Sequence, residues 1–173
     1  MADIDENDSI PGKDITISHG TCRITKIISG GQTGADQAAL DVAIEKGIPY
    51  GGWVPKGRLT EAGMLLEKYQ LKEMETASYP LRTEQNVIDS DGTLIVSHGE
   101  LTGGSAYTRE MAEKHGKPWI HIDADETPMK EAINLIWSWI DENQVEVLNV
   151  AGARASKDTK IYPRARAILE ALL

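Results

Sequence analysis

The chain has 173 residues, of which 40% are hydrophobic (AVILMFWYC), so it is long and apolar enough for one domain with a buried core. Its 18 basic and 27 acidic residues give a net charge of −9, which argues against a general nucleic-acid binder because phosphate backbones would be repelled. The single cysteine, Cys22, excludes an intramolecular disulfide and a cysteine-based zinc site. The sequence shows neither an apolar run of the roughly 20 residues that cross a membrane nor a signal-peptide pattern, and we expect a cytoplasmic protein with no membrane partner.

The N-terminal stretch differs in composition from the rest of the chain. Residues 1–14 hold five acidic residues against one lysine, and few large apolar side chains. Such a segment cannot bury enough apolar surface to fold. We therefore predict a disordered acidic leader over residues 1–20 and a single ligand-binding domain over residues 21–173.

Strand and helix patterns alternate along the first half of this domain. The isoleucine-rich run 24–28 predicts a strand. The stretch 35–46 has apolar residues stacked four apart, which is typical of a helix, and Gly47 supplies its stop. Further along, we predict an extended run over 48–54 and short helices over 60–68 and 82–88.

The second half of the domain continues the alternation. Residues 93–97 (TLIVS) form an apolar run that predicts a buried strand, and residues 104–115 predict a helix that ends at Gly116. Thr127 is the predicted N-cap of a further helix, with Pro128 in its first turn. The remaining predicted elements are strands over 118–122 and 145–150 and a last helix over 161–172.

Regular alternation of strands and helices favours an α/β fold, with a mainly parallel sheet covered by helices on both faces. The strands are apolar without a clean polar alternation, as expected when both faces of a sheet are buried. In such a sheet, ligands bind beyond the carboxyl ends of the strands. Three glycine-containing loops follow predicted strands at this edge, over residues 29–36, 102–108 and 151–156.

These loops have the composition of an anion site, most often a phosphate site. Glycine lets the backbone approach a ligand closely, and a helix N-terminus offers unpaired N–H groups with a partial positive charge. Arg154 adds a bidentate phosphate clamp. The alternative is that each loop is an ordinary strand-to-helix turn, since neither a P-loop nor a GxGxxG fingerprint is present. The candidate ligand contacts in the three loops are Ser29, Gly30, Gly31, Gln32, Thr33, Gly34, Asp36, Thr102, Gly103, Gly104, Ser105, Thr108, Gly152, Arg154 and Ser156.

Two further candidates follow the second predicted strand. Trp53 could stack on a pterin or purine ring while Lys56 pairs with its phosphate. The alternative is a core tryptophan beside two solvated cations, Lys56 and Arg58.

Several carboxylates are candidates for acid–base chemistry. Asp36 either bonds a ligand hydroxyl or acts as a favourable charge in the first turn of a helix. Asp89 and Asp91 precede a strand, where two close carboxylates could bind magnesium or serve as acid and base, although turn chemistry is the commoner role. The amide of Asn86 and the carboxylate of Glu110 are the remaining candidates for catalysis. The histidines show no metal-ligand spacing, so no metal site is predicted, and His98 is of interest only because it follows a strand near the second loop.

The sequence resembles a known family along nearly its whole predicted domain. The match runs through IISGGQTGADQAALDVAIEKGIPYGGWVPKGR (27–58), TEQNVIDSDGTLIVSHGELTGGSAYT (83–108), the lysine–proline pair at 117–118 and LNVAGARAS (148–156). These segments are similar to the circularly permuted YpsA-like branch of the SLOG superfamily, whose members are commonly labelled molybdenum cofactor carriers. The permutation is visible in the Gly152-Ala153-Arg154 unit, which closes this chain but opens unpermuted relatives.

The resemblance implies a Rossmann-like three-layer α/β/α sandwich, usually assembled as a homo-oligomer. It implies that the molybdenum cofactor (molybdopterin) or a nucleotide-like ligand binds at the glycine-loop edge, so the partner is a small phosphorylated molecule rather than a nucleic acid. The family is also similar to the LOG-type phosphoribohydrolases, whose signature is GGxGTxxE. Here the comparable stretch, 103–110, has Ala106 for the third glycine, and Thr108 and Glu110 are out of step by one residue.

The leading hypothesis is therefore a carrier that holds a phosphorylated pterin or nucleotide-like ligand without turning it over. The alternative is an enzyme acting on a nucleotide or NAD-derived substrate, such as an N-glycosidic hydrolase. It would use Asp36, Asp89, Asp91 or Glu110 as its carboxylate. A third interpretation is a nucleotide-sensing module.

Overall fold

A computed structural model describes residues 23–173 of the chain, and the predictions for the acidic leader and for Cys22 lie outside this part. Its elements alternate between strands and helices, with a group of two-residue strands between the first and second helices. In chain order they are β1 (Lys26–Ile28), α1 (Ala35–Lys46), β2 (Tyr50–Gly51), β3 (Trp53–Val54), β4 (Leu59–Thr60), β5 (Gly63–Met64), β6 (Lys72–Glu73), α2 (Tyr79–Ile88), β7 (Gly92–Ser97), α3 (Gly103–Lys114), β8 (Trp119–Asp123), α4 (Met129–Asn143), β9 (Val147–Gly152) and α5 (Ile161–Leu172).

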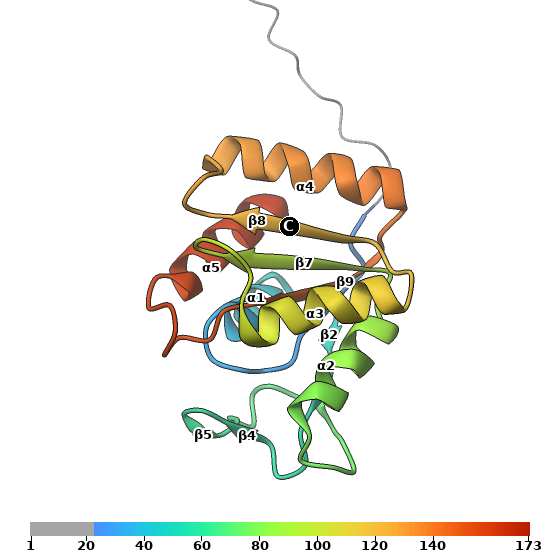
Figure 1. Ribbon diagram of the computed structural model, residues 1–173, viewed down its shortest axis with the longest axis vertical. Helices are drawn as coiled ribbons and strands as arrows, with labels where there is room; N and C mark the ends of the chain where they lie inside the picture. Colours follow the sequence, from blue (N-terminus) through green and yellow to red (C-terminus); the bar gives the residue numbers. More distant parts are fainter. Residues whose placement is uncertain (1–22) are drawn as a thin grey trace, which may run out of the picture.

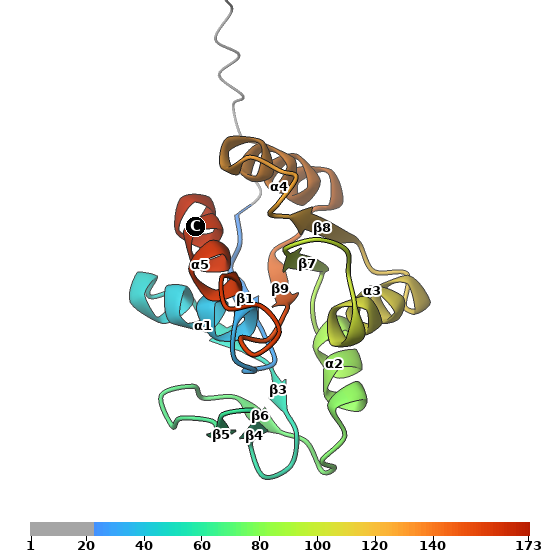
Figure 2. The ribbon, with the colours of Figure 1, turned by 60° about the vertical axis from the view of Figure 1, so that its left-hand side comes forward.

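The main sheet has five strands in the order β2-β1-β9-β7-β8, and each neighbouring pair is parallel. Helices α1, α5 and α4 lie on one side of it, and α2 and α3 pack together on the other (Figures 1 and 2). The Rossmann-like α/β/α fold expected from the sequence is confirmed. Every residue of β7 is buried, because helices cover both faces of the sheet at its centre.

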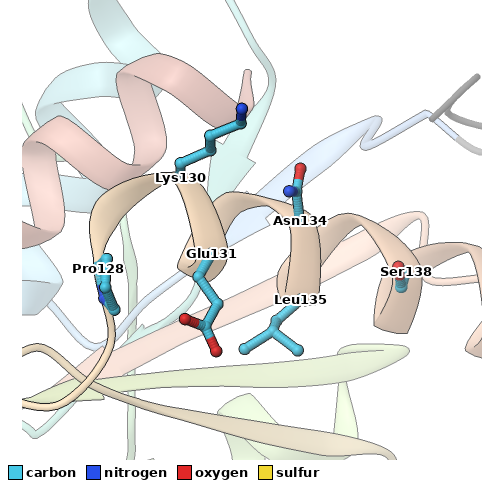
Figure 3. Close-up of a pocket in the computed structure, with 6 residues that line it drawn as sticks. All are labelled: Pro128, Lys130, Glu131, Asn134, Leu135 and Ser138. Carbon is cyan, nitrogen blue, oxygen red and sulfur yellow. The ribbon is translucent and has the colours of Figure 1, made fainter. Parts of the chain in front are cut away.

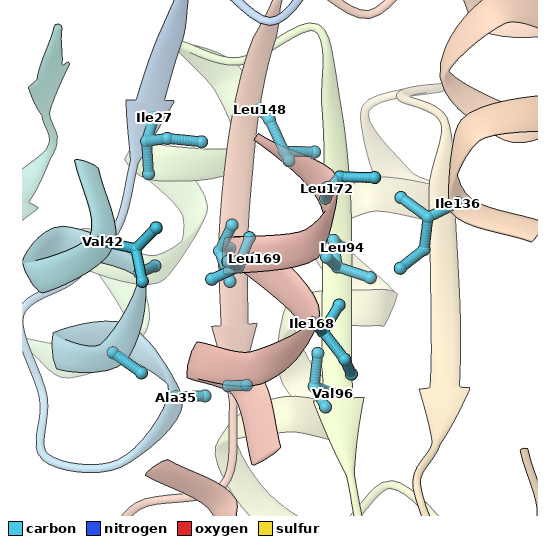
Figure 4. Packing of buried hydrophobic residues seen from close by; sticks show 14 of the residues in the cluster. Ile27, Ala35, Val42, Leu94, Val96, Ile136, Leu148, Ile168, Leu169 and Leu172 are labelled. Atoms are coloured by element: carbon cyan, nitrogen blue, oxygen red, sulfur yellow. The ribbon is translucent and has the colours of Figure 1, made fainter. Parts of the chain in front are cut away.

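The largest apolar cluster lies between the sheet and the α1/α5/α4 layer (Figure 4). Leu94 and Val96 of β7 and Leu148 of β9 face Ile168 and Leu169 of α5, all fully buried. Burial of side chains of this size contributes about 1.5–3 kcal/mol each. This packing fixes β9 and β7 side by side, and so fixes the position of the loops that follow them.

Several predicted elements are confirmed within a residue or two. The helices expected over 35–46, 104–115 and 161–172 are α1, α3 and α5, and Gly47 ends α1 in the left-handed conformation with φ 66°. The helix expected over 82–88 is α2, which begins earlier, at Tyr79, because the Ser78 side chain accepts a hydrogen bond from the Leu81 amide.

The prediction for the start of α4 is wrong. The helix begins at Met129, with Pro128 at the N-cap and no side-chain cap hydrogen bond. The extended ψ of 149° at Pro128 sets the boundary. Thr127 belongs to the preceding turn, where its amide donates to the Asp123 carbonyl.

The helix predicted over 60–68 is also wrong, since this stretch carries the β4–β5 hairpin. Arg58, which has a positive φ of 54°, donates from its guanidinium to the carbonyls of Leu66, Tyr69 and Leu71. The Leu66 carbonyl, which lies in the last turn of the predicted helix, therefore has its partner outside any helix. Leu65, Tyr69 and Leu71 bury their side chains against Leu40 and Val54 instead.

The extended run predicted over 48–54 is interrupted at Gly52, which has a φ of 129° and where a Cβ would clash with the Ser29 carbonyl. As a result β2 joins the main sheet, whereas β3 pairs with β6. Among the helices of residues 23–173, none combines the length and the apolar character needed to cross a membrane.

Candidate functional site

The three predicted glycine loops meet at one cavity at the carboxyl edge of the sheet. Strands β1 and β9 lead to helices α1 and α5 on one side, whereas the neighbouring strand β7 leads to α3 on the other (Figure 2). Such a reversal opens a crevice in parallel sheets. The cavity here has a volume of about 510 Å³ and is lined by Gln32, Asp36, Arg82, Thr83, Thr102, Gly103, Gly104, Ser105, Thr108, Ala151, Gly152, Ala153, Arg154 and Lys157.

The N-terminus of α3 opens onto this cavity. Thr102 is its N-cap residue and makes no side-chain cap hydrogen bond. A Cβ added at Gly103 or Gly104 would meet no atom within 4 Å, so the backbone here is accessible. The hydroxyls of Ser105 and Thr108 donate back to the carbonyls of Thr102 and Gly104. The backbone amides, rather than these hydroxyls, are the donors that the turn offers to an anion.

Arg82 lines the cavity from α2, and the sequence analysis did not identify it. Its side chain is 11% exposed and lies against Gly30, where an added Cβ would clash with the guanidinium. Its Nη1 lies 3.5 Å from Oδ2 of Asp36, a loose ion pair, and its buried Nε has no hydrogen-bond partner among residues 23–173. Arg82 lies in the first turn of the short helix α2, so only the packing of α2 beside the first loop reveals its role.

Asp36 is the buried counter-charge to Arg82. Burial raises the pKa of Asp36 above its usual range, against the opposing effects of Arg82 and of the Gln32 amide, which donates to Oδ2 over 3.2 Å. Gln32 itself is 7% exposed, and its Nε2 is buried with no hydrogen-bond partner among residues 23–173. Arg82 and Gln32 thus each hold a buried donor without a partner in the described chain, and both side chains line the cavity.

The rest of the first loop serves packing rather than the cavity. Ser29 is fully buried and its hydroxyl donates to the Val150 carbonyl over 2.7 Å. A Cβ at Gly31 would press on Leu65, and one at Gly34 would clash with the Ala153 carbonyl. Of the residues predicted in this loop, only Gln32 and Asp36 line the cavity.

Glu61, on the β4–β5 hairpin, ties the first loop to the third. Its carboxylate accepts hydrogen bonds from the Thr33 hydroxyl and from both the amide and the hydroxyl of Ser156. Nε of Arg154 lies 3.9 Å from the same carboxylate. Burial opposes ionisation of Glu61, but these donors prevail and its pKa is lowered. The hydroxyls of Thr33 and Ser156 thus already donate to Glu61. Nothing in the local sequence around Glu61 identified this role.

The chain matches a known protein family over most of its length. Residues 27–173 match the sequence profile of the circularly permutated YpsA SLOG family. The chain belongs to this family.

This chain is also similar to a protein whose structure has been solved. A crystal structure of a provisionally named molybdenum carrier protein from Syntrophus aciditrophicus SB is 59% identical, with a TM-score of 0.86 over 87% of this chain and 95% of that chain. No curated protein matches the sequence.

Trp53 and Lys56 lie outside the cavity of this SLOG fold. The indole Nε1 of Trp53 donates to Oδ2 of Asp89 over 2.7 Å, and Lys72 lies over its ring at 5.3 Å. Asn86 pairs with the Trp53 backbone through both amide atoms, at 2.8 and 3.2 Å. Lys56 is exposed. The bonds of Trp53 to Asn86 and Asp89 hold β3 against α2, and neither Trp53 nor Lys56 is among the residues that line the cavity of the three loops.

The carboxylates considered for catalysis are not brought together. Asp91 accepts from the amides of Glu146 and Val147 at the start of β9, which is the opposite edge of the sheet. Asp89 bonds Trp53, and Glu110 is exposed on α3. Asp36 alone lines the cavity. Within residues 23–173, no group of three or more histidine, cysteine or acidic side chains is placed to hold a metal ion.

A separate hollow of about 380 Å³ lies along α4, away from the glycine loops (Figure 3). Glu131 and Leu135 project from the same side of the helix, and Leu135 is exposed. The hollow carries no glycine turn and no cluster of cations. Its lining residues are Pro128, Lys130, Glu131, Asn134, Leu135 and Ser138.

Proposed function

We propose that this SLOG protein is a carrier that binds a phosphorylated pterin or nucleotide-like ligand, of the molybdenum cofactor type, in the cavity at the carboxyl edge of the sheet. The observation that carries the proposal is the open N-terminus of α3, where Gly103 and Gly104 line the cavity together with Arg82, Arg154 and Lys157. Unpaired backbone N–H groups at a helix N-terminus, next to cationic side chains, favour a bound anion.

The charges around the cavity favour an anion, although the chain as a whole is acidic. Arg82, Arg154 and Lys157 line it together with the amides of Gly103 and Gly104. Arginine forks and helix N-termini both suit phosphate geometry. Asp36 faces the same space, but the guanidinium of Arg82 compensates its charge. We therefore assign the phosphate to the side of the cavity formed by α3, Arg82 and the third loop.

A carrier role agrees with the carboxylates of the cavity. Binding without turnover needs preorganised donors and shelter from water, not an acid and a base. Asp36 is the only one of the four proposed catalytic carboxylates that lines the cavity, and it is paired with Arg82. The name of the relative from Syntrophus aciditrophicus points in the same direction. Of the four carboxylates predicted for the alternative, an N-glycosidic hydrolase, Asp36 would be the one at hand in this cavity.

Isothermal titration tests the proposal with inorganic phosphate, AMP and the molybdenum cofactor as probes. Gly104→Asp puts a carboxylate at the phosphate position, where open space and the helix dipole both tolerate it. We expect its affinity for all three probes to fall at least tenfold. Ser138→Asp, which makes the same charge change on exposed α4, is the matched control and should bind like the original protein.

Equal binding of phosphate by the Gly104→Asp variant and the original protein would remove the model. Base release from a nucleotide, abolished by Asp36→Asn, would establish the enzyme in place of the carrier.

A further inference from the structure

A second polar cavity adjoins the first. It has a volume of about 410 Å³ and lies beyond the carboxyl ends of β7, β8 and β9, with His98, Asp125 and Asp158 in its wall. The two cavities have Thr102, Ser105, Ala153 and Lys157 in common. They are thus two chambers of one groove, and a ligand whose phosphate lies in the first chamber has room to extend into the second.

A histidine–aspartate pair is fixed in the wall of the second chamber. Nδ1 of His98 lies 2.6 Å from Oδ2 of Asp158. The other oxygen of Asp158 accepts from the Lys160 amide over 2.9 Å, which holds the carboxylate in place. Of the two neutral tautomers of His98, the Asp158 carboxylate selects the one with its proton on Nδ1, and this tautomer has a lone pair on Nε2. Among residues 23–173, no hydrogen-bond partner is found for this Nε2, and the side chain is 20% exposed.

The two chambers differ in their acceptors. The first is lined by Arg82, Arg154 and the start of α3, with Asp36 as its one carboxylate. The second is lined by His98 and by the carboxylates of Glu100, Asp125 and Asp158, together with Lys157 and Lys160. A ligand with its anionic group in the first chamber can therefore offer hydrogen-bond donors, such as amino, ring N–H or hydroxyl groups, to acceptors in the second.

We propose that the second chamber recognises the donor-bearing ring or sugar of the phosphorylated ligand, with His98 Nε2 as the acceptor that determines specificity. Asp158 is the positioning residue, because it acts by orienting the imidazole. This inference rests on the proposed function, since it places the phosphate of the same ligand in the first chamber. A plain phosphate touches only the first chamber and does not sense His98.

Titration with inorganic phosphate and with GMP separates the two chambers. We expect the original protein to bind GMP at least tenfold more tightly than phosphate. His98→Asn keeps an amide near the Nδ1 position, where it bonds Asp158, but removes the acceptor at Nε2. It should lose most of the GMP advantage, about tenfold, while phosphate affinity and the thermal midpoint stay the same. His98→Gln, which restores an amide oxygen near Nε2, should recover part of the loss.

His115→Asn is the matched control, because His115 also pairs with a carboxylate, with its Nε2 2.7 Å from Oε1 of Glu84, and lines neither chamber. IMP and 2′-deoxy-GMP identify the donor: the loss in His98→Asn shrinks for IMP if the ring amino group is recognised, and for 2′-deoxy-GMP if the sugar is.

GMP binding no tighter than phosphate, or an equal effect of His98→Asn on both probes, would overturn the second-chamber assignment. Failure of phosphate itself to bind would instead overturn the proposed function, so the two failures are distinguishable.

Discussion

The turn before α1 and the turn before α3 have similar sequences but opposite roles. Both contain two adjacent glycines, both follow a parallel strand, and both precede a helix. The first is closed: Gly31 and Gly34 are surrounded by Leu65 and the Ala153 carbonyl. The second is open, since nothing lies within 4 Å of a Cβ at Gly103 or Gly104.

The difference comes from what covers each turn. The segment between β3 and α2 folds over the first turn and places Leu65 and Glu61 against it. Within residues 23–173, no such segment covers the start of α3. A glycine turn at the end of a strand therefore indicates that something approaches the backbone closely. This can be another part of the chain or a ligand. We expect substitutions in the closed turn to affect stability and substitutions around the open turn to affect binding.

The largest expected effect is on stability, from Gly34→Ala. Gly34 has φ 87° and ψ −126°, which only glycine adopts readily, and its Cβ would clash with the Ala153 carbonyl. We expect the free energy of unfolding to fall by about 3 kcal/mol in urea denaturation. A loss below about 1 kcal/mol would show that the turn can relax and is not closed.

The next effect is on binding, from the double variant Arg82→Gln with Asp36→Asn. The neutral pair keeps the shape of the buried ion pair but removes the guanidinium. We expect phosphate affinity to weaken by about 2 kcal/mol, as for other charged hydrogen bonds, with a much smaller change in stability. Titration calorimetry and urea denaturation of the same preparations check both. Unchanged phosphate affinity would place Arg82 outside the site.

Glu61→Gln tests whether the Glu61 contacts belong to stability alone. It weakens the hydrogen bonds from Thr33 and Ser156, and we expect a loss of about 1 kcal/mol in the free energy of unfolding. Phosphate affinity should stay within about twofold, a factor worth about 0.4 kcal/mol. A larger loss of affinity would mean that the first turn takes part in binding after all.

The same carboxylate gives a pH dependence of stability. Because the pKa of Glu61 is lowered in the folded protein, its contribution is fully present above the usual value of 4.5 and is lost as the pH falls through the folded-state pKa. The gap in unfolding free energy between the original protein and Glu61→Gln should therefore be constant near neutral pH and shrink below about pH 4.5. Urea denaturation at pH 7 and pH 3.5 measures it. A gap that widens on acidification contradicts this assignment.

The smallest expected effect is from Gly104→Ala. This position lies in the first turn of α3, without a positive φ and with open space around it. Alanine should raise the free energy of unfolding by about 0.5 kcal/mol because it restricts the unfolded chain. Thermal or urea denaturation of both variants should show a gain in the free energy of unfolding for Gly104→Ala and a loss for Gly34→Ala. A clear loss of stability would show that the second turn is also closed.

The sequence by itself determined the alternation of strands and helices, apart from the segment between β3 and α2, and the edge at which the glycine loops meet. Apolar periodicity and the glycine stop at Gly47 are local signals, and parallel strands bring all their carboxyl ends to one edge. It could not determine which loop residues face the cavity. Arg82, Glu61 and Asp158 are brought to the site by long-range packing and carry no local pattern, and only the fold pairs Asp158 with His98, which the sequence marked by its place after a strand. The errors have the same cause: the Leu66 carbonyl of the helix predicted over 60–68 accepts from the Arg58 side chain instead, and Asn86 and Asp89 engage Trp53. Only the tertiary structure decides how polar groups are paired, because each one bonds whichever partner the packed chain places within reach.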